Sequence, residues 1–171
     1  VTLPTAAWLS LKTGMPNLMA WYPLFFLFVL VPACDYALGH DSVNIEKSQE
    51  SAISNTFWFK ALTLMVLPVQ IASLIWSARW FVHQDLNWLG TIGWLFSQGI
   101  VSSILAINVA HELIHKDAKL ERAIGGILLT SVSYYGFKIE HLRGHHVHVS
   151  TPEDASSARF GQSLWAFMPQ A

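Results

Sequence analysis

Two short clusters contain five of the chain's eight histidines. The first cluster runs His111-Glu-Leu-Ile-His115, and the second runs His141-Leu-Arg-Gly-His145-His146. Imidazole is the commonest protein ligand for metal ions near neutral pH, and five imidazoles at these spacings are more than packing requires. The two clusters therefore predict a metal site built from all five of these histidines.

The spacing inside each cluster is helical. His111 and His115 are four residues apart, as are His141 and His145, so each pair lies on one face of a helix. Asn108 comes about one turn before His111 and is predicted to hydrogen-bond a ligand imidazole. Two histidines at a helix end can also act simply by interacting with the helix dipole, so the first pair alone leaves metal binding open.

The first cluster also matches the pattern H-E-x-x-H, in which Glu112 would be the general base of a zinc protease. Catalytic zinc takes about three protein ligands, and the second cluster offers three histidines more than the motif contains. Five imidazoles suit two metal ions better than one tetrahedral zinc. All-nitrogen ligation of two adjacent metals is typical of non-haem iron that activates dioxygen to oxidise an unactivated C–H bond. A membrane zinc protease remains the alternative.

The composition indicates a membrane protein and excludes several other classes. The chain is 53% hydrophobic and 12% charged, about half the charged share of about 25% in soluble domains. The net charge of −1 supplies no basic stripe, so a nucleic-acid partner is excluded. Cys34 is the only cysteine, which excludes an intrachain disulfide and a multi-thiolate metal site. Electrons for oxygen chemistry would have to come from a separate redox carrier.

Three apolar segments are long enough to approach the roughly 20 residues that cross a bilayer. We expect residues 1–11 to be the end of an earlier, truncated span. The predicted fold is an all-α membrane helical bundle. Residues 1–110 are predicted to form the transmembrane helices, and residues 111–171 a region that contains both histidine clusters and is incomplete at its C-terminus. The predicted full spans are about 17–34, 56–78 and 88–110.

The apolar stretch 123–137 decides whether the clusters can share one site. If it crossed the bilayer, the two clusters would face opposite compartments. We therefore predict a helix that dips into the interface or lies along it, which keeps both clusters on one side. Lysine and arginine are more frequent on that side, so the positive-inside rule places both clusters in the cytoplasm.

Several segments resemble one family, the integral-membrane alkane 1-monooxygenases (alkane hydroxylases). Asn108-Val-Ala-His-Glu-Leu-Ile-His-Lys116 resembles that family's first histidine box, and Glu140-His-Leu-Arg-Gly-His-His146 resembles its second. Residues 149–163 resemble the stretch that follows the second box, and Pro32-Ala-Cys-Asp35 with Gly39 and Asp41 resembles the loop after the second span. The likeness covers nearly the whole chain. Ala155 stands where the family usually has proline, which affects only the rigidity of the loop.

The resemblance implies a six-span enzyme of the bacterial inner membrane that hydroxylates the terminal methyl of medium-chain n-alkanes to 1-alkanols. It implies two non-haem iron ions, dioxygen, and electrons from rubredoxin fed by rubredoxin reductase. The five clustered histidines are carried over as iron ligands, and Leu27 is placed in the substrate channel. The family's third box, Asn-Tyr-x-Glu-His-Tyr-Gly, and a further histidine cluster are expected beyond Ala171, so we expect this chain to be a fragment that is inactive alone. Lys116, Asp154 and Arg159 match family positions that are expected to form ion pairs around the site or to dock the electron donor. The full set of predicted supporting residues is Asn108, Glu112, Lys116, Glu140, Asp154 and Arg159.

A related membrane hydroxylase acting on xylene or cymene methyl groups is the nearest alternative. The stretch from Thr151 to Asp154, together with Arg159, favours the alkane branch. The three remaining histidines are predicted to be surface or loop residues without a metal, and they are His40, His83 and His148.

Overall fold

The computed structural model describes residues 2–39, 46, 48 and 56–170. Every regular element within these ranges is helical, and the predicted all-α fold is confirmed. Asp41 and His40 lie outside the described residues, so the expectations placed on them are not addressed by the structure.

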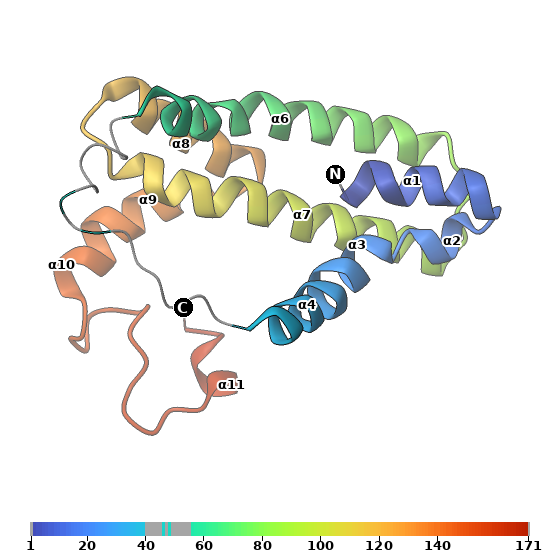
Figure 1. Ribbon diagram of the computed structural model, residues 1–171. Coiled ribbons are helices and arrows are strands. Elements are labelled where there is room, and N and C mark those ends of the chain that lie inside the picture. The colour runs from blue at the N-terminus through green and yellow to red at the C-terminus, as the bar shows by residue number, and fades with distance from the viewer. Residues whose placement is uncertain (1, 40–45, 47, 49–55, 171) are drawn as a thin grey trace.

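Two long apolar helices, α6 (Phe57–Val82) and α7 (Trp88–Ile114), lie side by side and form the main body of the molecule (Figure 1). Their 26 and 27 residues correspond to about 39 and 40 Å at the rise of an α-helix, more than the about 30 Å of a hydrocarbon core. Both are long and apolar enough to cross a membrane. Each continues four residues past its predicted span, and α7 thereby takes His111 into the same helix, so the predicted boundary at residue 110 falls inside α7.

The N-terminal region is divided more finely than predicted. Helix α1 (Thr2–Thr13) is followed by the short α2 (Pro16–Met19), a turn, and a continuous helical segment over Tyr22–Leu38. A proline stands in the first turn of α2 and of α3 (Tyr22–Phe25), where its missing N–H costs no hydrogen bond. Pro32 of α4 (Val31–Leu38) lies inside the continuous helical segment. The π-helical η1 (Phe26–Leu30) joins α3 to α4.

Two expectations for this region are therefore corrected. The predicted span 17–34 is interrupted by the turn after α2, and the helix that follows is shorter than α6 and α7. Pro32 to Asp35, predicted to be a loop after a span, lies inside α4, because the helical segment that begins at Tyr22 continues to Leu38.

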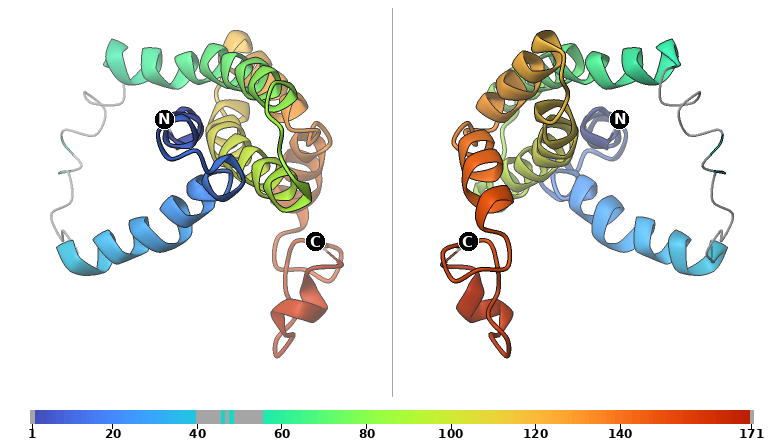
Figure 2. Two further views of the ribbon diagram at one scale, coloured as in Figure 1. Left: turned by 90° about the vertical axis from the view of Figure 1, so that its right-hand side faces the viewer. Right: turned by 90° about the vertical axis from the view of Figure 1, so that its left-hand side faces the viewer.

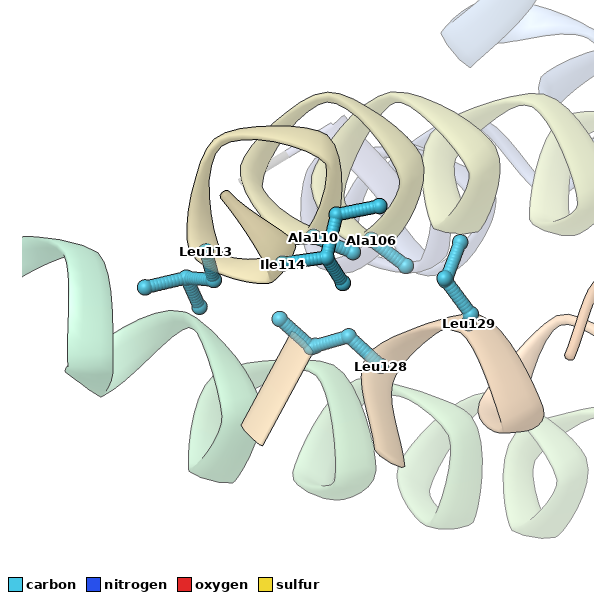
Figure 3. Packing of buried hydrophobic residues seen from close by; sticks show 6 residues of the cluster. All are labelled: Ala106, Ala110, Leu113, Ile114, Leu128 and Leu129. Atoms are coloured by element: carbon cyan, nitrogen blue, oxygen red, sulfur yellow. The ribbon is translucent and has the colours of Figure 1, made fainter. Parts of the chain in front are cut away.

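Helix α8 (Lys119–Ser131) runs antiparallel to α7 and contacts α6 as well. Gly125 allows this close approach, since a Cβ there would lie 3.1 Å from the Ala110 carbonyl oxygen. At the other end of α8, Gln70 of α6 donates a hydrogen bond to Ser131 (3.4 Å). Six buried side chains form the contact between α7 and α8 (Figure 3), and they are Ala106, Ala110, Leu113, Ile114, Leu128 and Leu129.

After α8 the chain turns at Ser133, whose φ is +60°. It returns through α9 (Phe137–Ile139), the π-helical η2 (Glu140–His145) and α10 (His146–His148) toward the end of α7. Both histidine clusters therefore lie at the same end of the helical bundle. Figure 2 shows the C-terminal segment with α11 (Leu164–Phe167) projecting from the helical bundle.

Candidate metal centre

The end of α7 and the return segment bring four imidazoles together. Nε2 of His141 lies 2.8 Å from Nε2 of His111, 3.1 Å from Nε2 of His115 and 3.0 Å from Nε2 of His146. Ring nitrogens that bind one metal ion at about 2.0–2.1 Å are about 3.3 Å from one another in a tetrahedron. The ligand nitrogens of His111, His115 and His141 lie within 4.8 Å of one another, and Nε2 of His146 adjoins that of His141, so the predicted convergence of the two clusters is seen in the structure.

The protonation of these rings suits a metal ion. The pKa of His141 is lowered from 6.5 to about 4, first by burial and then by the neighbouring His111 and His146. Burial also lowers the pKa of His115, followed by the effects of His146 and His111. A neutral imidazole keeps a lone pair on one nitrogen. A cation placed among the four Nε2 atoms would use these lone pairs, which otherwise face one another, so the donor set fits a bound metal.

The first two histidines are fixed by the end of α7. His111 and His115 lie one turn apart on that helix, with ring centroids 5.1 Å apart. Arg122 of α8 donates through Nη1 to the carbonyl oxygens of Lys116 (3.2 Å) and Asp117 (2.8 Å). These two carbonyls follow the last residue of α7, so Arg122 fixes the turn that joins α7 to α8. The helix end that carries His115 is thus held by α8.

The His141 ring is held by aromatic stacking. Phe137 stacks on it with a centroid distance of 4.8 Å and an interplanar angle of 15°. Tyr134 in turn stacks on Phe137, with a centroid distance of 5.0 Å and an interplanar angle of 26°. Neither aromatic residue was predicted to belong to the site. The signal available in the sequence was the four-residue spacing from Phe137 to His141, which places both on one helix face.

His145 is placed differently from the other four histidines. Its ring is nearly parallel to that of His141, with centroids 5.6 Å apart and an interplanar angle of 19°. Its Nδ1 lies 2.9 Å from Oδ2 of Asp154. The fifth predicted ligand therefore adjoins the four converging rings and is tied to a carboxylate on its other side.

Asp154 is a buried carboxylate with several donors. Ser157 donates through Oγ to Oδ2 (2.5 Å), and the backbone N–H of Ser156 donates to Oδ1 (3.0 Å). The pKa of Asp154 is lowered, first by the hydrogen bond from Ser157 and then by those from Ser156 and His145, against an opposing effect of burial. The two serines were not predicted to take part in the site.

The other predicted supporting residues lie around this centre without joining it. Oε1 of Glu112 is 3.6 Å from Nδ1 of His111, so it faces the ring nitrogen that is not part of the cluster. The exposed side chain of Asn108 forms no hydrogen bond with the described part of the chain, and its predicted role stays a prediction. Lys116 is exposed at the end of α7. Glu140 lines a pocket of about 530 Å³ that also includes His141 and His145.

Three further residues complete the comparison with the prediction. Arg159 is exposed and lines a surface pocket with Asp154. Leu27 lines a small pocket of about 170 Å³ with Val101 and Leu105 of α7, an apolar lining that suits the predicted substrate channel without testing it. His83 and His148 are exposed, as surface histidines should be.

Comparison with known proteins finds relatives that match the part of the chain with both histidine clusters. The fatty acid desaturase family matches residues 86–171, which include both clusters. Alkane 1-monooxygenase 2 of Pseudomonas aeruginosa is 44% identical over 171 residues, covering 99% of this chain and 45% of that protein. Alkane 1-monooxygenase 1 of the same organism is 47% identical over 173 residues, covering 100% and 45%.

A xylene/toluene monooxygenase hydroxylase component of Pseudomonas putida is more distant, at 28% identity over 83 residues, with 48% of this chain and 22% of that protein covered. The chain spans a little under half the length of the two alkane 1-monooxygenases. It belongs to the fatty acid desaturase family of membrane proteins and is similar over its whole length to bacterial alkane 1-monooxygenases.

Proposed function

We propose that this chain is part of a membrane monooxygenase that hydroxylates the terminal methyl of medium-chain n-alkanes to 1-alkanols with dioxygen. The observation that carries the proposal is the convergence of four Nε2 atoms from two histidine boxes beside the end of the apolar helix α7. Because the chain covers 45% of its alkane 1-monooxygenase relatives, the reaction is proposed for the protein over the full length of those relatives.

The proposed cofactor is a pair of non-haem iron ions. Neutral imidazoles are good ligands for first-row transition metals, and five of them exceed the need of one four-coordinate ion. His111, His115, His141 and His146 would hold one ion, and His145 would contribute to the pair. When bound, the iron supplies the dioxygen-dependent oxidation of the C–H bond.

The chain's own apolar surfaces support an apolar substrate. Val101 and Leu105 lie on α7, two to three turns before His111, and line pockets with Leu27 and with Leu3 of α1. A linear hydrocarbon seated along α7 would therefore point one end toward the histidines. Such an apolar lining excludes water and contacts the hydrocarbon substrate along its length. On this basis Leu27 is proposed as a substrate-contacting residue.

The proposed orientation puts both histidine boxes at the cytoplasmic face of a bacterial inner membrane. Lys60 lies 3.7 Å from Glu121 at the end of the bundle that carries the boxes, and Lys116, Lys119 and Arg122 belong to the same end. The positive-inside rule then applies. Since Cys34 is the only cysteine, electrons are proposed to arrive from rubredoxin, which is reduced by rubredoxin reductase.

Two alternatives are less well supported. A zinc protease would need Glu112 beside the metal-bound water, but its carboxylate lies next to Nδ1 of His111, the nitrogen outside the cluster. A xylene-type hydroxylase is disfavoured because its relative matches 48% of the chain at 28% identity, against nearly the whole chain for the alkane enzymes.

The test uses the full-length protein produced with rubredoxin and rubredoxin reductase in a host that does not oxidise alkanes. We expect n-octane or n-decane to be converted to the 1-alkanol, measured by gas chromatography, and iron to co-purify. His115→Ala should abolish the product, whereas the matched variant His83→Ala, which changes an exposed histidine, should leave it unchanged. Zinc in place of iron, or no alkanol from the wild-type protein, would contradict the proposal.

A further inference from the structure

The loop that follows the second histidine box is folded around one carboxylate. Ser150 adopts a φ of +66°, and its backbone N–H donates to Oγ of Ser157 (3.0 Å). The same Oγ donates to Oδ2 of Asp154, and the N–H of Ser156 donates to Oδ1. The side chain of Asp154 is only 3% exposed, although its neighbours Glu153 and Ala155 are exposed. The loop therefore buries an acid in a segment that is otherwise open to solvent.

Asp154 determines which nitrogen of His145 carries hydrogen. An ionised carboxylate only accepts hydrogen bonds, so the 2.9 Å contact between Oδ2 and Nδ1 of His145 requires the hydrogen on Nδ1. The lone pair of a neutral His145 ring is then on Nε2. Among the described residues, His145 is the one clustered histidine whose Nδ1 is hydrogen-bonded to a carboxylate, since Glu112 is 3.6 Å from Nδ1 of His111.

We propose that Asp154 is a positioning residue of the metal centre, which holds His145 in the tautomer and orientation that present Nε2 to a metal ion. Ser156 and Ser157 hold the carboxylate in place. Hydrogen bonds of this kind from a carboxylate to a ligand histidine orient the ring and raise its basicity, and their loss typically weakens metal binding about 10- to 100-fold. The inference rests on the proposed function only in requiring that the histidines bind a metal.

A role limited to closing the loop makes a different prediction. The contact from Oδ1 to the N–H two residues later is an Asx turn, which asparagine forms as well as aspartate does. Asp154→Asn therefore keeps the turn but presents an amide N–H₂ group where Oδ2 accepts from His145. The amide group and Nδ1–H of His145 are both donors, so the hydrogen bond between them is lost while the turn is kept. The variant therefore tests the positioning role without disturbing the turn.

The experiment uses the full-length protein and two readouts that do not depend on turnover. In the metal-free wild-type protein, nitrogen NMR of labelled histidines should show His145 with its hydrogen on Nδ1, the signal being assigned by its absence in His145→Gln. Asp154→Asn should shift that signal away from the Nδ1–H form. Titration of iron(II) against a chelator should then give an affinity about 10- to 100-fold weaker for Asp154→Asn. Glu153→Gln, the adjacent exposed carboxylate, should match the wild type in both readouts.

The inference is overturned if Asp154→Asn keeps both the tautomer and the iron affinity of the wild type, or if Glu153→Gln weakens iron binding equally. If Asp154→Asn does not fold, Ser157→Ala removes only one donor from the carboxylate and should cause a smaller loss of affinity in the same direction; unchanged affinity there counts against the inference. A protein with Nδ1–H His145 and Asp154-dependent iron binding that never produces alkanol supports the inference and rejects the proposed function. If Asp154→Asn keeps full hydroxylation and full iron binding, the proposed function is supported and the inference is rejected.

Discussion

The two halves of the histidine centre are held in place by different forces. His111 and His115 lie at the end of α7, whose buried face packs on α8 through apolar side chains, and the two carbonyls just after it accept from Arg122. His141 and His145 belong to η2, of which no residue is fully buried. Their rings are held by Phe137 and Asp154 instead. The first half depends on helix packing, and the second depends on individual contacts to each ring.

The largest effect should come from the packing under the first half. Leu128 is fully buried between α7 and α8, and Leu128→Ala leaves a cavity where leucine contacted α7. Core truncations of this kind cost about 2–5 kcal/mol of the free energy of unfolding. We expect thermal or denaturant unfolding in detergent to show this loss. The control is Ile127→Ala on the exposed side of the same helix, which is half exposed and should change stability much less. Equal losses in the two variants would contradict the packing of α8 on α7.

The next prediction tests whether the two halves form one electrostatic unit. His141 has a pKa of about 4 in the folded protein against an ordinary value of 6.5, owing first to burial and then to His111, His146 and His115. Between these two values the unfolded chain binds a proton that the folded one does not, so the free energy of unfolding falls as pH decreases from 6.5 to about 4. We expect the melting temperature of the metal-free protein to drop over this window.

The control for the acid dependence is His141→Asn, which removes the central ring and keeps a neutral side chain. The drop in melting temperature between pH 6.5 and 4 should be smaller in this variant. If the melting temperature of His141→Asn depends on pH as steeply as that of the wild type, the rings of the two clusters do not affect one another's protonation in solution. The two halves would then be independent in their charges as well as in their packing.

The sequence predicted the clustered histidines better than it predicted the residues that hold them in place. The sequence predicted that the two clusters share one site, and the structure brings His111, His115, His141 and His146 together. The four-residue spacing inside each cluster is a local property of the sequence and can be recognised without knowing the fold. The stacking of Phe137 on His141 was accessible in principle from spacing, but aromatic residues are common throughout this chain, so the pair did not stand out.

Contacts between distant segments could not be predicted in the same way. Gln70 contacts Ser131 and Lys60 contacts Glu121 only because α8 lies alongside α6 in the same direction, and nothing in the sequence of either helix specifies that partner. Asp154 was expected to support the site through ion pairing or donor docking. Its place beside His145 depends on the turn made by Ser156 and Ser157, which is a property of the folded loop.

A smaller effect is expected from the aromatic support of the second half. Phe137→Leu keeps an apolar side chain of similar size but removes the ring that stacks on His141. Aromatic pairs contribute about 0.5–1.5 kcal/mol beyond burial. We expect a loss of iron affinity of up to about tenfold, since 1.4 kcal/mol is a factor of ten, with little change in the melting temperature. Tyr135→Leu changes an exposed aromatic two residues earlier and should leave iron affinity unchanged.

The smallest effect should come from the ion pair between α6 and α8. Lys60 is 61% exposed and lies 3.7 Å from Glu121, which is 11% exposed. Exposed pairs contribute about 0–1 kcal/mol, and one exposed partner screens this pair. Lys60→Gln should therefore lower the free energy of unfolding by less than Leu128→Ala does, with a difference that shrinks at high salt. Lys119→Gln, an exposed lysine in the first turn of α8, is the matched control for loss of one positive charge. A loss in Lys60→Gln as large as that in Leu128→Ala would mean that charge, and not apolar packing, holds α8 against the long helices, which would remove the distinction between the two halves of the centre.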